Sequence, residues 1–290
     1  MHLQEALGQF QVQLRADGRS EHTRKQYQRH VAALIAWLSK SGKPSAVGTV
    51  KPATVAEFFA SDEARFSARG GAKKATSANA QRTSLRCFFR WAHEAGLAST
   101  NAARLLKRAR CAPPPPRALR EDEQKRLLEV LAAARGDEAR RDEMLVRLLL
   151  GTGVRIGSAL ALDVENVDLE HGELDVKKAK GDRPCAVAIP KKVATQLRRY
   201  LRGRASGPLF ATASGRVSTR HAQRRLAGWL AAAGIAGRSA HALRHSFAMR
   251  VYAKTRDLLT TQMAMGHAAI TSTCVYAHAD RARVRAAVGA

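Results

Sequence analysis

Six residues of the kinds that carry out phosphoryl transfer stand in four short segments of this chain. The first segment, 151–160, has one arginine among small residues, and the second, 180–183, has a lysine beside a glycine. The third has a histidine and an arginine three residues apart, and the fourth has a histidine followed nine residues later by a tyrosine. In chain order the six residues are Arg155, Lys180, His241, Arg244, His267 and Tyr276.

Together these residue types can transfer a phosphodiester without a metal ion. Two arginines can neutralise the charge that builds up on phosphorus, because each guanidinium can bind two phosphate oxygens. On a helix, His241 and Arg244 share one face, so both can reach the same phosphate. Lys180 is suited to protonate a leaving oxygen. A histidine is suited to help deprotonate the phenol of Tyr276, whose ordinary pKa is about 10.

The surrounding sequence predicts the elements that position these groups. Arg155 is expected in a turn between two helices, and Lys180 at a turn, residues 179–182, joining strands 173–176 and 185–189. Apolar residues at helical spacing predict the other elements of this half. The expected helices are 121–134, 142–150, 191–201, 219–233, 242–252 and 257–263.

The first part of the chain reads as helical throughout, with helices at 3–16, from Ser20 or Thr23, at 50–60, and from Thr76 or Ser77. Leu85, Phe88, Phe89 and Trp91 are expected to face inward. Basic residues recur near and along the last of these helices, where they form either a DNA-facing side or a solvated face. These candidate DNA-binding residues are Lys73, Lys74, Arg82, Arg86 and Arg90.

A run of four prolines, residues 113–116, divides the sequence. Consecutive prolines favour an extended spacer over a helix, although a rigid loop within one domain has the same composition. We therefore predict a domain at 1–111, a linker at 112–117 and a second domain at 118–290. The fold class expected is mainly α: an N-terminal helical bundle followed by a mostly helical domain with a small antiparallel sheet.

The charge of the chain favours a polyanionic partner. Fifty Lys and Arg face 24 Asp and Glu, a net charge of +26, and residues 1–110 alone carry 19 basic against 7 acidic side chains. Nucleic acid is the first candidate, and a ribosome-associated or merely basic protein is the alternative. The four cysteines form no CxxC pair, so neither a zinc site nor a disulfide framework is expected. Without a long apolar run, we expect a cytoplasmic protein without a membrane partner.

Taken one at a time, these residues have ordinary explanations. Arg155 could cap a helix, Lys180 could be solvated, and His241 and His267 could be structural histidines. His245 is expected to be structural, because no third metal ligand stands at a suitable spacing. Tyr27 and Tyr252 lie in apolar helical patterns and are expected in the core, whereas Tyr200 could contact a DNA backbone. The joint order and spacing of the six residues favour the catalytic interpretation.

The motifs resemble those of the tyrosine recombinase (phage integrase) family, most closely the bacterial Xer-type recombinases. The segments that carry the resemblance are TGVRIGSAL, LDVENVDLEHGELDV, KAKGD, HALRHSFA and MGHAAITSTCVYAH. The resemblance implies a SAM-like core-binding domain before the catalytic domain, together clamping duplex DNA. It also implies a tetramer on two recombination sites, an association with the nucleoid, and no cofactor or metal. A second recombinase could be a partner, and residues 281–290 could pack on a neighbouring subunit.

The same resemblance implies a role for each of the six residues. Arg155 and Arg244 would clamp the phosphate, Lys180 would act as the general acid, and His241 as a general acid or base. His267 would hydrogen-bond the scissile phosphate, and Tyr276 would form a covalent 3′-phosphotyrosine. Two positions depart from the family pattern. Ser158 stands where an acidic residue is usual, and Ala179 replaces the glycine before the lysine.

The expected function is therefore site-specific recombination of DNA, in the manner of chromosome or plasmid dimer resolution. Three alternatives remain open at this point. The same chemistry would serve an integrase or transposase of a mobile element, or a type IB topoisomerase, and a decayed recombinase could bind DNA without cutting it.

Overall fold

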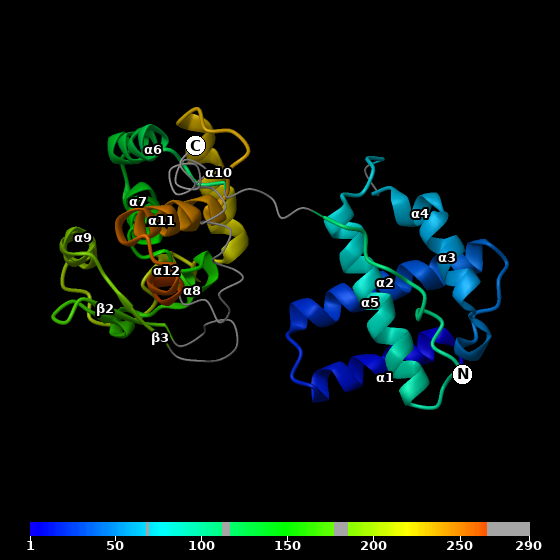
Figure 1. Cartoon of the computed structure of the whole chain (residues 1–290). Helices are drawn as coiled ribbons and strands as arrows, with labels where there is room; N and C mark the ends of the chain where they lie inside the picture. Colours follow the sequence, from blue (N-terminus) through cyan, green and yellow to red (C-terminus); the bar gives the residue numbers. More distant parts are fainter. Residues whose placement is uncertain (68–69, 112–116, 177–184, 266–290) are drawn as a thin grey trace. The chain divides into compact units, whose positions relative to one another are not determined.

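The computed structural model describes residues 1–67, 70–111, 117–176 and 185–265. The chain forms two compact units, Met1–Ala112 and Pro113–Ala290. Both are built mainly from helices, and short antiparallel strands occur in the second (Figure 1). The predicted fold class, a mainly α chain with a small antiparallel sheet, is confirmed.

The N-terminal unit is a bundle of helices around an aromatic core. Its elements are α1 (Leu3–Ala16), α2 (Glu21–Lys40), η1 (Val47–Thr49), α3 (Pro52–Ala60), α4 (Asp62–Arg65) and α5 (Ala75–Glu94). Phe10 of α1 stacks on Tyr27 and meets Phe88 and Trp91 of α5, with ring centroids 5.2–6.1 Å apart. These contacts join the first helices to the last one, so the predicted inward residues do form the core.

Local signals set most of the helix starts in this unit. The Ser20 hydroxyl accepts a hydrogen bond from the Thr23 amide and caps α2, as predicted. Pro52 occupies the start of α3, where its missing N–H is not needed, so this helix begins two residues later than predicted. Helix α5 begins at Ala75, one residue before the predicted cap, and the four-residue α4 was not predicted.

The last described residues before position 112 are held on α5 by one buried side chain. Asn79, 4% exposed, donates from Nδ2 to the Ala109 carbonyl at 2.8 Å and accepts the Ala109 amide at 2.9 Å. The pair satisfies both backbone groups of Ala109. Thus α5 buries part of its polar face under the segment that leads to the prolines.

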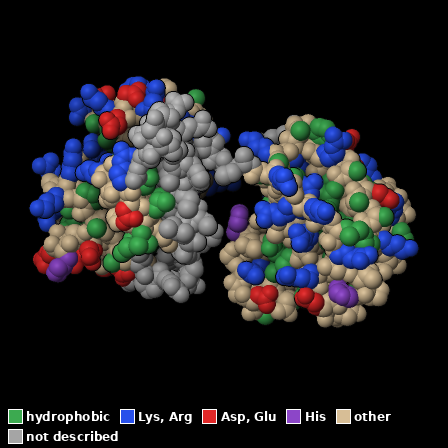
Figure 2. Space-filling model, in the orientation of Figure 1, with side chains coloured by type: hydrophobic (Ala, Val, Ile, Leu, Met, Phe, Trp, Pro, Cys, Tyr) green, Lys and Arg blue, Asp and Glu red, His purple; other side chains and the backbone are tan. Residues whose placement is uncertain are grey.

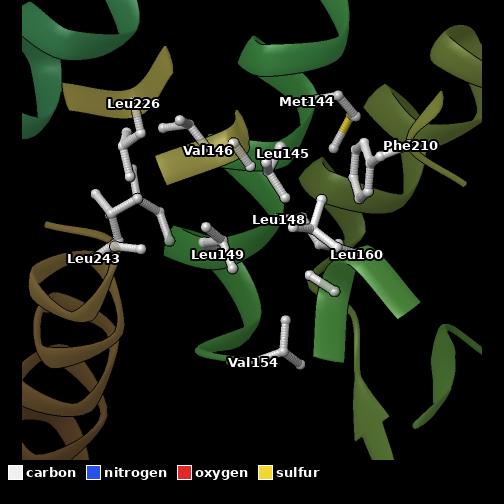
Figure 3. Close-up of a cluster of buried hydrophobic side chains, with 14 of the residues drawn as sticks. Met144, Leu145, Val146, Leu148, Leu149, Val154, Leu160, Phe210, Leu226 and Leu243 are labelled. Atoms are coloured by element: carbon white, nitrogen blue, oxygen red, sulfur yellow. The ribbon is translucent and has the colours of Figure 1, made fainter. Parts of the chain in front are cut away.

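The second unit surrounds α7 (Asp137–Thr152) with shorter elements. They are α6 (Glu121–Ala133), α8 (Ile156–Ala161), η2 (Val164–Asn166), β1 (Val167–Asp168), β2 (Glu173–Val176), β3 (Cys185–Ala188), α9 (Lys191–Leu201), β4 (Ala211–Thr212), β5 (Gly215–Arg216), α10 (Thr219–Ala232), α11 (Ala240–Thr255) and α12 (Leu258–Met265). The strands β1, β2 and β3 pair in that order, all antiparallel, with Val176 opposite Cys185. In Figure 3, side chains of α7 fill the centre of the core, with Leu226 and Leu243 on one side and Phe210 on the other.

Two helices are longer than the sequence suggested. Helix α7 begins at Asp137 and not at 142. Its first turns consist mostly of charged residues, so they lack the apolar spacing that predicts a helix, although Ala139, Arg141 and Asp142 are buried there. Helix α11 spans Ala240–Thr255 where 242–252 was expected. The sequence placed a helix after Arg155 but gave no bounds for α8, and it did not predict the hairpin of β4 and β5. Elements this short carry too few residues to show a period. No helix in the described part of the chain is both long and apolar enough to cross a bilayer.

Asp142 is the centre of a buried ionic network between α7 and α10. Its Oδ1 accepts two hydrogen bonds from Arg141, at 2.8 and 3.1 Å. Its Oδ2 accepts from Arg225 and, at 2.9 Å, from the indole N–H of Trp229. The side chains of Arg141 and Asp142 are 5% and 7% exposed, so neither charge can turn to bulk water when its partner is lost.

Replacing Asp142 with asparagine is expected to lower the free energy of unfolding by about 3 kcal/mol, because the buried Arg141 charge loses its buried carboxylate partner. The remaining carboxylate near Arg141 is that of the exposed Glu138, at 3.8 Å. Denaturant unfolding of the full chain measures this change. The matched control is Glu129→Gln, which removes an exposed carboxylate 3.9 Å from Lys125 and should change stability by less than about 0.5 kcal/mol. Equal effects of the two substitutions would contradict this assignment.

His30 gives the N-terminal unit a pH-dependent stability. Its Nδ1 lies 2.8 Å from the Ser84 hydroxyl, which itself donates to the Ala80 carbonyl. Burial, followed by the charges of Arg29 and Lys73, lowers the pKa of His30 from 6.5 to about 4. The unfolded chain therefore binds this proton more readily than the folded chain does.

The contribution of His30 to stability is complete above pH 6.5 and is lost as the pH falls toward about 4. We expect the unfolding midpoint of the chain to fall over this window. In the His30→Gln variant the fall should be smaller, since the uncharged amide takes up no proton. Thermal unfolding at several pH values tests this expectation, and an identical fall in both proteins would contradict it.

Candidate active site

The turn that carries Arg155 begins at the C-terminal end of α7. Gly153 ends the helix with φ of +66°, and its amide donates to the Leu149 carbonyl at 3.0 Å. A Cβ at this position would collide with the ring of Phe247. Glycine is therefore required both for the left-handed conformation and for the close approach of α11. Arg155 follows two residues later and precedes α8, so it lies between two helices as predicted.

Core side chains next to the two arginines hold them in place. Val154, 5% exposed, precedes Arg155, and the fully buried Leu243 precedes Arg244. Both belong to the core cluster around α7 that is drawn in Figure 3. Because such a core is closely packed, the backbone at these positions has little freedom. Arg155 itself is half-buried at the start of α8.

Arg244 is nearly buried, at 4% exposure, and links three elements. It donates to the Gly153 carbonyl in the turn after α7, and at 2.6 Å to the Met265 carbonyl at the end of α12. Neutral carbonyl acceptors orient a guanidinium without cancelling its charge. His241 lies in the first turn of α11, three residues before Arg244. Both residues are therefore on one helix, as the sequence predicted.

His241 lies on α11 three residues before Arg244. Burial of the ring, followed by the positive charges of Arg244 and Arg155, lowers the pKa of His241 below its usual 6.5. Its ring meets that of His245 edge to face, with centroids 5.0 Å apart. Burial, followed by the charges of His241 and Arg244, also lowers the pKa of His245, to about 4. His241 thus shares α11 with an arginine that contacts the turn leading to Arg155.

Two sequence models of protein families match the chain. The model described as the phage integrase family matches residues 117–283, and the model of the phage integrase N-terminal SAM-like domain matches residues 7–96. The chain belongs to the phage integrase family. It is thus a tyrosine recombinase, and both the predicted family and the predicted SAM-like N-terminal domain are confirmed.

Curated relatives of this tyrosine recombinase are Xer proteins. Tyrosine recombinase XerD of Ralstonia nicotianae is 33% identical over 287 residues, which are 93% of this chain and 87% of the relative. Tyrosine recombinase XerC of Vibrio parahaemolyticus is 32% identical over 289 residues, which are 96% of this chain and 89% of the relative. The prediction of an enzyme of site-specific DNA recombination, closest to the Xer type, is confirmed by this similarity.

Solved structures share the fold. A XerA recombinase matches with a TM-score of 0.51 at 25% identity, covering 98% of this chain and 96% of that one. XerH bound to palindromic difH substrate matches with a TM-score of 0.74 at 20% identity, over 91% of this chain and 78% of that one. A lambda integrase tetramer bound to a Holliday junction matches with a TM-score of 0.71 at 20% identity, over 93% and 79%. The last two likenesses concern the fold alone.

Three predicted catalytic residues of this tyrosine recombinase, Lys180, His267 and Tyr276, lie outside the described residues. The structure describes the elements next to two of them in the sequence. Strands β2 and β3, on either side of residues 177–184, pair from Glu173 opposite Ala188 to Val176 opposite Cys185. Helix α12 ends at Met265, whose carbonyl accepts from Arg244 two residues before His267 in the sequence. The three roles therefore remain predictions.

The candidate DNA-binding residues of the N-terminal unit differ in their surroundings. Lys74 and Arg86 are exposed, whereas the Arg82 guanidinium lies 5.0 Å from the centre of the Phe59 ring, and Arg90 lies 3.9 Å from Glu94. The Lys73 ammonium donates to the Glu63 carbonyl at 3.0 Å and to Gln81 at 3.3 Å, and burial, followed by the charge of Arg29, lowers its pKa. Figure 2 shows many other Lys and Arg side chains on the visible face of this unit.

The other three tyrosines all pack within the units. Tyr27 packs on the N-terminal core and Tyr252 is 6% exposed, as predicted. The Tyr200 hydroxyl donates to the Leu209 carbonyl at 3.2 Å, and burial of the ring raises its pKa. A raised pKa disfavours the phenolate that attack on phosphorus needs.

Sequence reasoning missed two side chains beside the arginine turn, Phe247 and Arg250. They stand three and six residues after Arg244 on α11. No pattern in the sequence indicates that these two side chains reach the end of α7.

Proposed function

We propose that this chain cuts and rejoins DNA at specific sites through a covalent 3′-phosphotyrosine on Tyr276, as an Xer-like recombinase. The observation that carries the proposal is that Arg244, three residues after His241 on α11, donates to the Gly153 carbonyl in the turn that leads to Arg155. Arg244 is held by contacts with two buried carbonyls, and Arg155 follows the buried Val154. Burial, followed by the charges of Arg244 and Arg155, lowers the pKa of His241.

The chemistry is an in-line exchange at phosphorus. The Tyr276 oxygen attacks the scissile phosphate, the bond from phosphorus to the 5′ oxygen breaks, and Lys180 gives its proton to that oxygen. The 5′ hydroxyl of a second strand reverses these steps and releases the tyrosine. His267 donates a hydrogen bond to a phosphate oxygen. No atom is lost, and no cofactor is consumed in either direction.

The two arginines stabilise the transition state. Attack by tyrosine concentrates negative charge on the oxygens of phosphorus, and Arg155 and Arg244 neutralise that charge from fixed positions. Because Arg244 is almost buried, its charge acts in a medium of lower dielectric than water. A preorganised guanidinium needs no reorientation as the charge develops, which makes the stabilisation specific for the transition state.

His241 acts in this proposal as the base for Tyr276, and this role predicts a pH profile. The pKa of His241 is lowered below 6.5 by burial, then by Arg244 and Arg155, so the imidazole is neutral near pH 7. Cleavage should stay constant as the pH falls toward 6.5 and decline only below it, as the imidazole takes up a proton.

Single-turnover formation of the covalent complex as a function of pH measures this decline. His171→Gln is the matched control, because His171 is exposed and hydrogen-bonded to Asp168, which raises its pKa. The control should have the wild-type profile. A decline centred at or above pH 6.5 in the wild type would contradict the role of His241.

Several features of the assembly belong to the same proposal. The chain would grip duplex DNA with a core-binding domain, residues 1–111, and a catalytic domain, residues 118–290, joined by the linker 112–117. The matched ranges 7–96 and 117–283 support these limits. Four copies, with or without a partner recombinase, would assemble on two sites near the nucleoid, as the Holliday junction complex of lambda integrase suggests.

The DNA site must be found before the reaction can be tested. Fragmented genomic DNA bound by the purified chain gives the sequence, which is then placed twice, as direct repeats, on a supercoiled plasmid. A recombinase produces two smaller circles, and a plasmid with one site is the control. Relaxation of both plasmids without new circles would instead indicate a type IB topoisomerase, and unchanged plasmids would indicate a non-catalytic protein.

The genomic position of the bound sequence separates the two biological roles. A single site on the chromosome or a plasmid supports dimer resolution. Paired sites at the ends of one segment support the mobile-element alternative.

A further inference from the structure

Three side chains of α11 hold the end of α7 and the turn that follows it. Arg244 donates to the Gly153 carbonyl, the Phe247 ring packs on the Gly153 Cα, and Arg250 donates to the Leu150 carbonyl at 2.5 Å. These contacts span the last turn of α7 and the start of the turn leading to Arg155. Only Arg244 belongs to the proposed catalytic group.

The contact of Arg250 is with a carbonyl at the open end of a helix. The last four carbonyls of a helix have no amide partner within it, and basic side chains often supply one. Leu150 lies two residues before the last residue of α7, and its carbonyl accepts a hydrogen bond from Nη2 of Arg250. A positive charge at this end also interacts favourably with the helix dipole.

The Arg250 side chain is itself held in place. Its guanidinium lies 5.7 Å from the centre of the Phe247 ring, in the range of a cation–π contact. Burial lowers the pKa of the Arg250 guanidinium. Phe247 therefore lies against both Arg250 and the glycine of the turn, and the three residues form one packed unit with the end of α7.

We propose that Arg250 is a positioning residue for Arg155, acting through the Leu150 carbonyl and the Phe247 ring. This inference rests on the proposed function of Arg155 as a phosphate-binding arginine. Loss of the Arg250 contact would let the last turn of α7 fray, which would shift Gly153 and the residues after it. A displacement of about 1 Å at a reacting group can cost about 100-fold in rate.

The variant Arg250→Met keeps an unbranched apolar stem like that of arginine but has no donor. We expect it to slow single-turnover cleavage of a nicked duplex carrying the bound site by about 10- to 100-fold. Affinity for that duplex should stay within about twofold, because binding energy is distributed over many phosphate contacts. Arg250→Lys retains a donor and should recover part of the rate. Lys254→Met, the matched control, removes an exposed charge one turn further along α11 and should cleave like the wild type.

A double-mutant cycle separates positioning from general stability. If Arg250 acts through Arg155, its replacement should slow the Arg155→Lys enzyme much less than it slows the wild type, since the group being positioned is already impaired. Arg250→Gln, with a shorter amide donor, replaces the methionine variant in the cycle if that variant does not fold.

The possible outcomes are distinct. Equal fold losses in the wild-type and Arg155→Lys backgrounds would overturn the positioning role, as would full activity of the Arg250 variants or a loss confined to DNA affinity. Wild-type cleavage by Arg155→Lys alone would instead contradict the proposed function of Arg155, whatever the Arg250 variants do.

Discussion

Replacing Arg244 with glutamine is expected to slow DNA cleavage by about 100- to 1,000-fold, the usual cost of losing one preorganised group that stabilises the transition state. The substitution removes a charge that is 4% exposed and directed by the Gly153 and Met265 carbonyls. A glutamine is too short to reach both carbonyls and carries no charge to offset that of phosphorus.

The same substitution should also destabilise the catalytic unit. Leaving a buried carbonyl without its donor costs about 1–3 kcal/mol. Two measurements therefore belong together. The first is denaturant unfolding, and the second is single-turnover cleavage without denaturant, at a temperature where the variant remains folded. Lys254→Met, on the same helix and exposed, is the control for general loss of positive charge.

A substrate with an uncharged methylphosphonate at the scissile position separates the two effects of Arg244. Less negative charge develops on this substrate, so the arginine has less to neutralise and the loss in the variant should shrink. An equal loss on the natural and the uncharged substrate would mean that Arg244 acts only as a structural link between α7, α11 and α12. That outcome would contradict its role at the phosphate.

Helices with a clear apolar period were predicted well, and polar groups that are buried were not. The bounds of α1, α9 and β2 agree with the sequence pattern, and Ser20 caps α2 as expected. By contrast, Asn79 and Gln81 of α5 are polar and nearly buried, which the sequence analysis did not predict. Their partners, the Ala109 backbone and Lys73, come from segments in which apolar residues show no regular spacing. No local sequence pattern therefore predicts these contacts.

The same distinction applies to the candidate site. The sequence placed Arg155 in a turn and His241 with Arg244 on one helix face, because glycine and the helical period determine both. It gave no indication that Arg250 would reach the Leu150 carbonyl, 100 positions earlier in the chain. Side chains that hold a catalytic turn from another element appear only when the packing of α7 on α11 is known.

Tyr276 is the residue on which the whole account depends, and its replacement has the largest expected effect. A nucleophile that forms a covalent bond has no substitute among the neighbouring groups, so Tyr276→Phe should abolish cleavage while leaving DNA binding intact. Tyr200→Phe is the matched control, since it removes a phenol whose hydroxyl donates to the Leu209 carbonyl.

The most direct measurement uses a nicked duplex of the bound site, on which cleavage releases a short fragment and traps the covalent complex. The wild type and Tyr200→Phe should form the complex, peptide mapping should find the DNA on Tyr276, and Tyr276→Phe should form none. A covalent complex formed by Tyr276→Phe, or DNA attached to another residue of the wild type, would contradict the assignment of Tyr276 as the nucleophile.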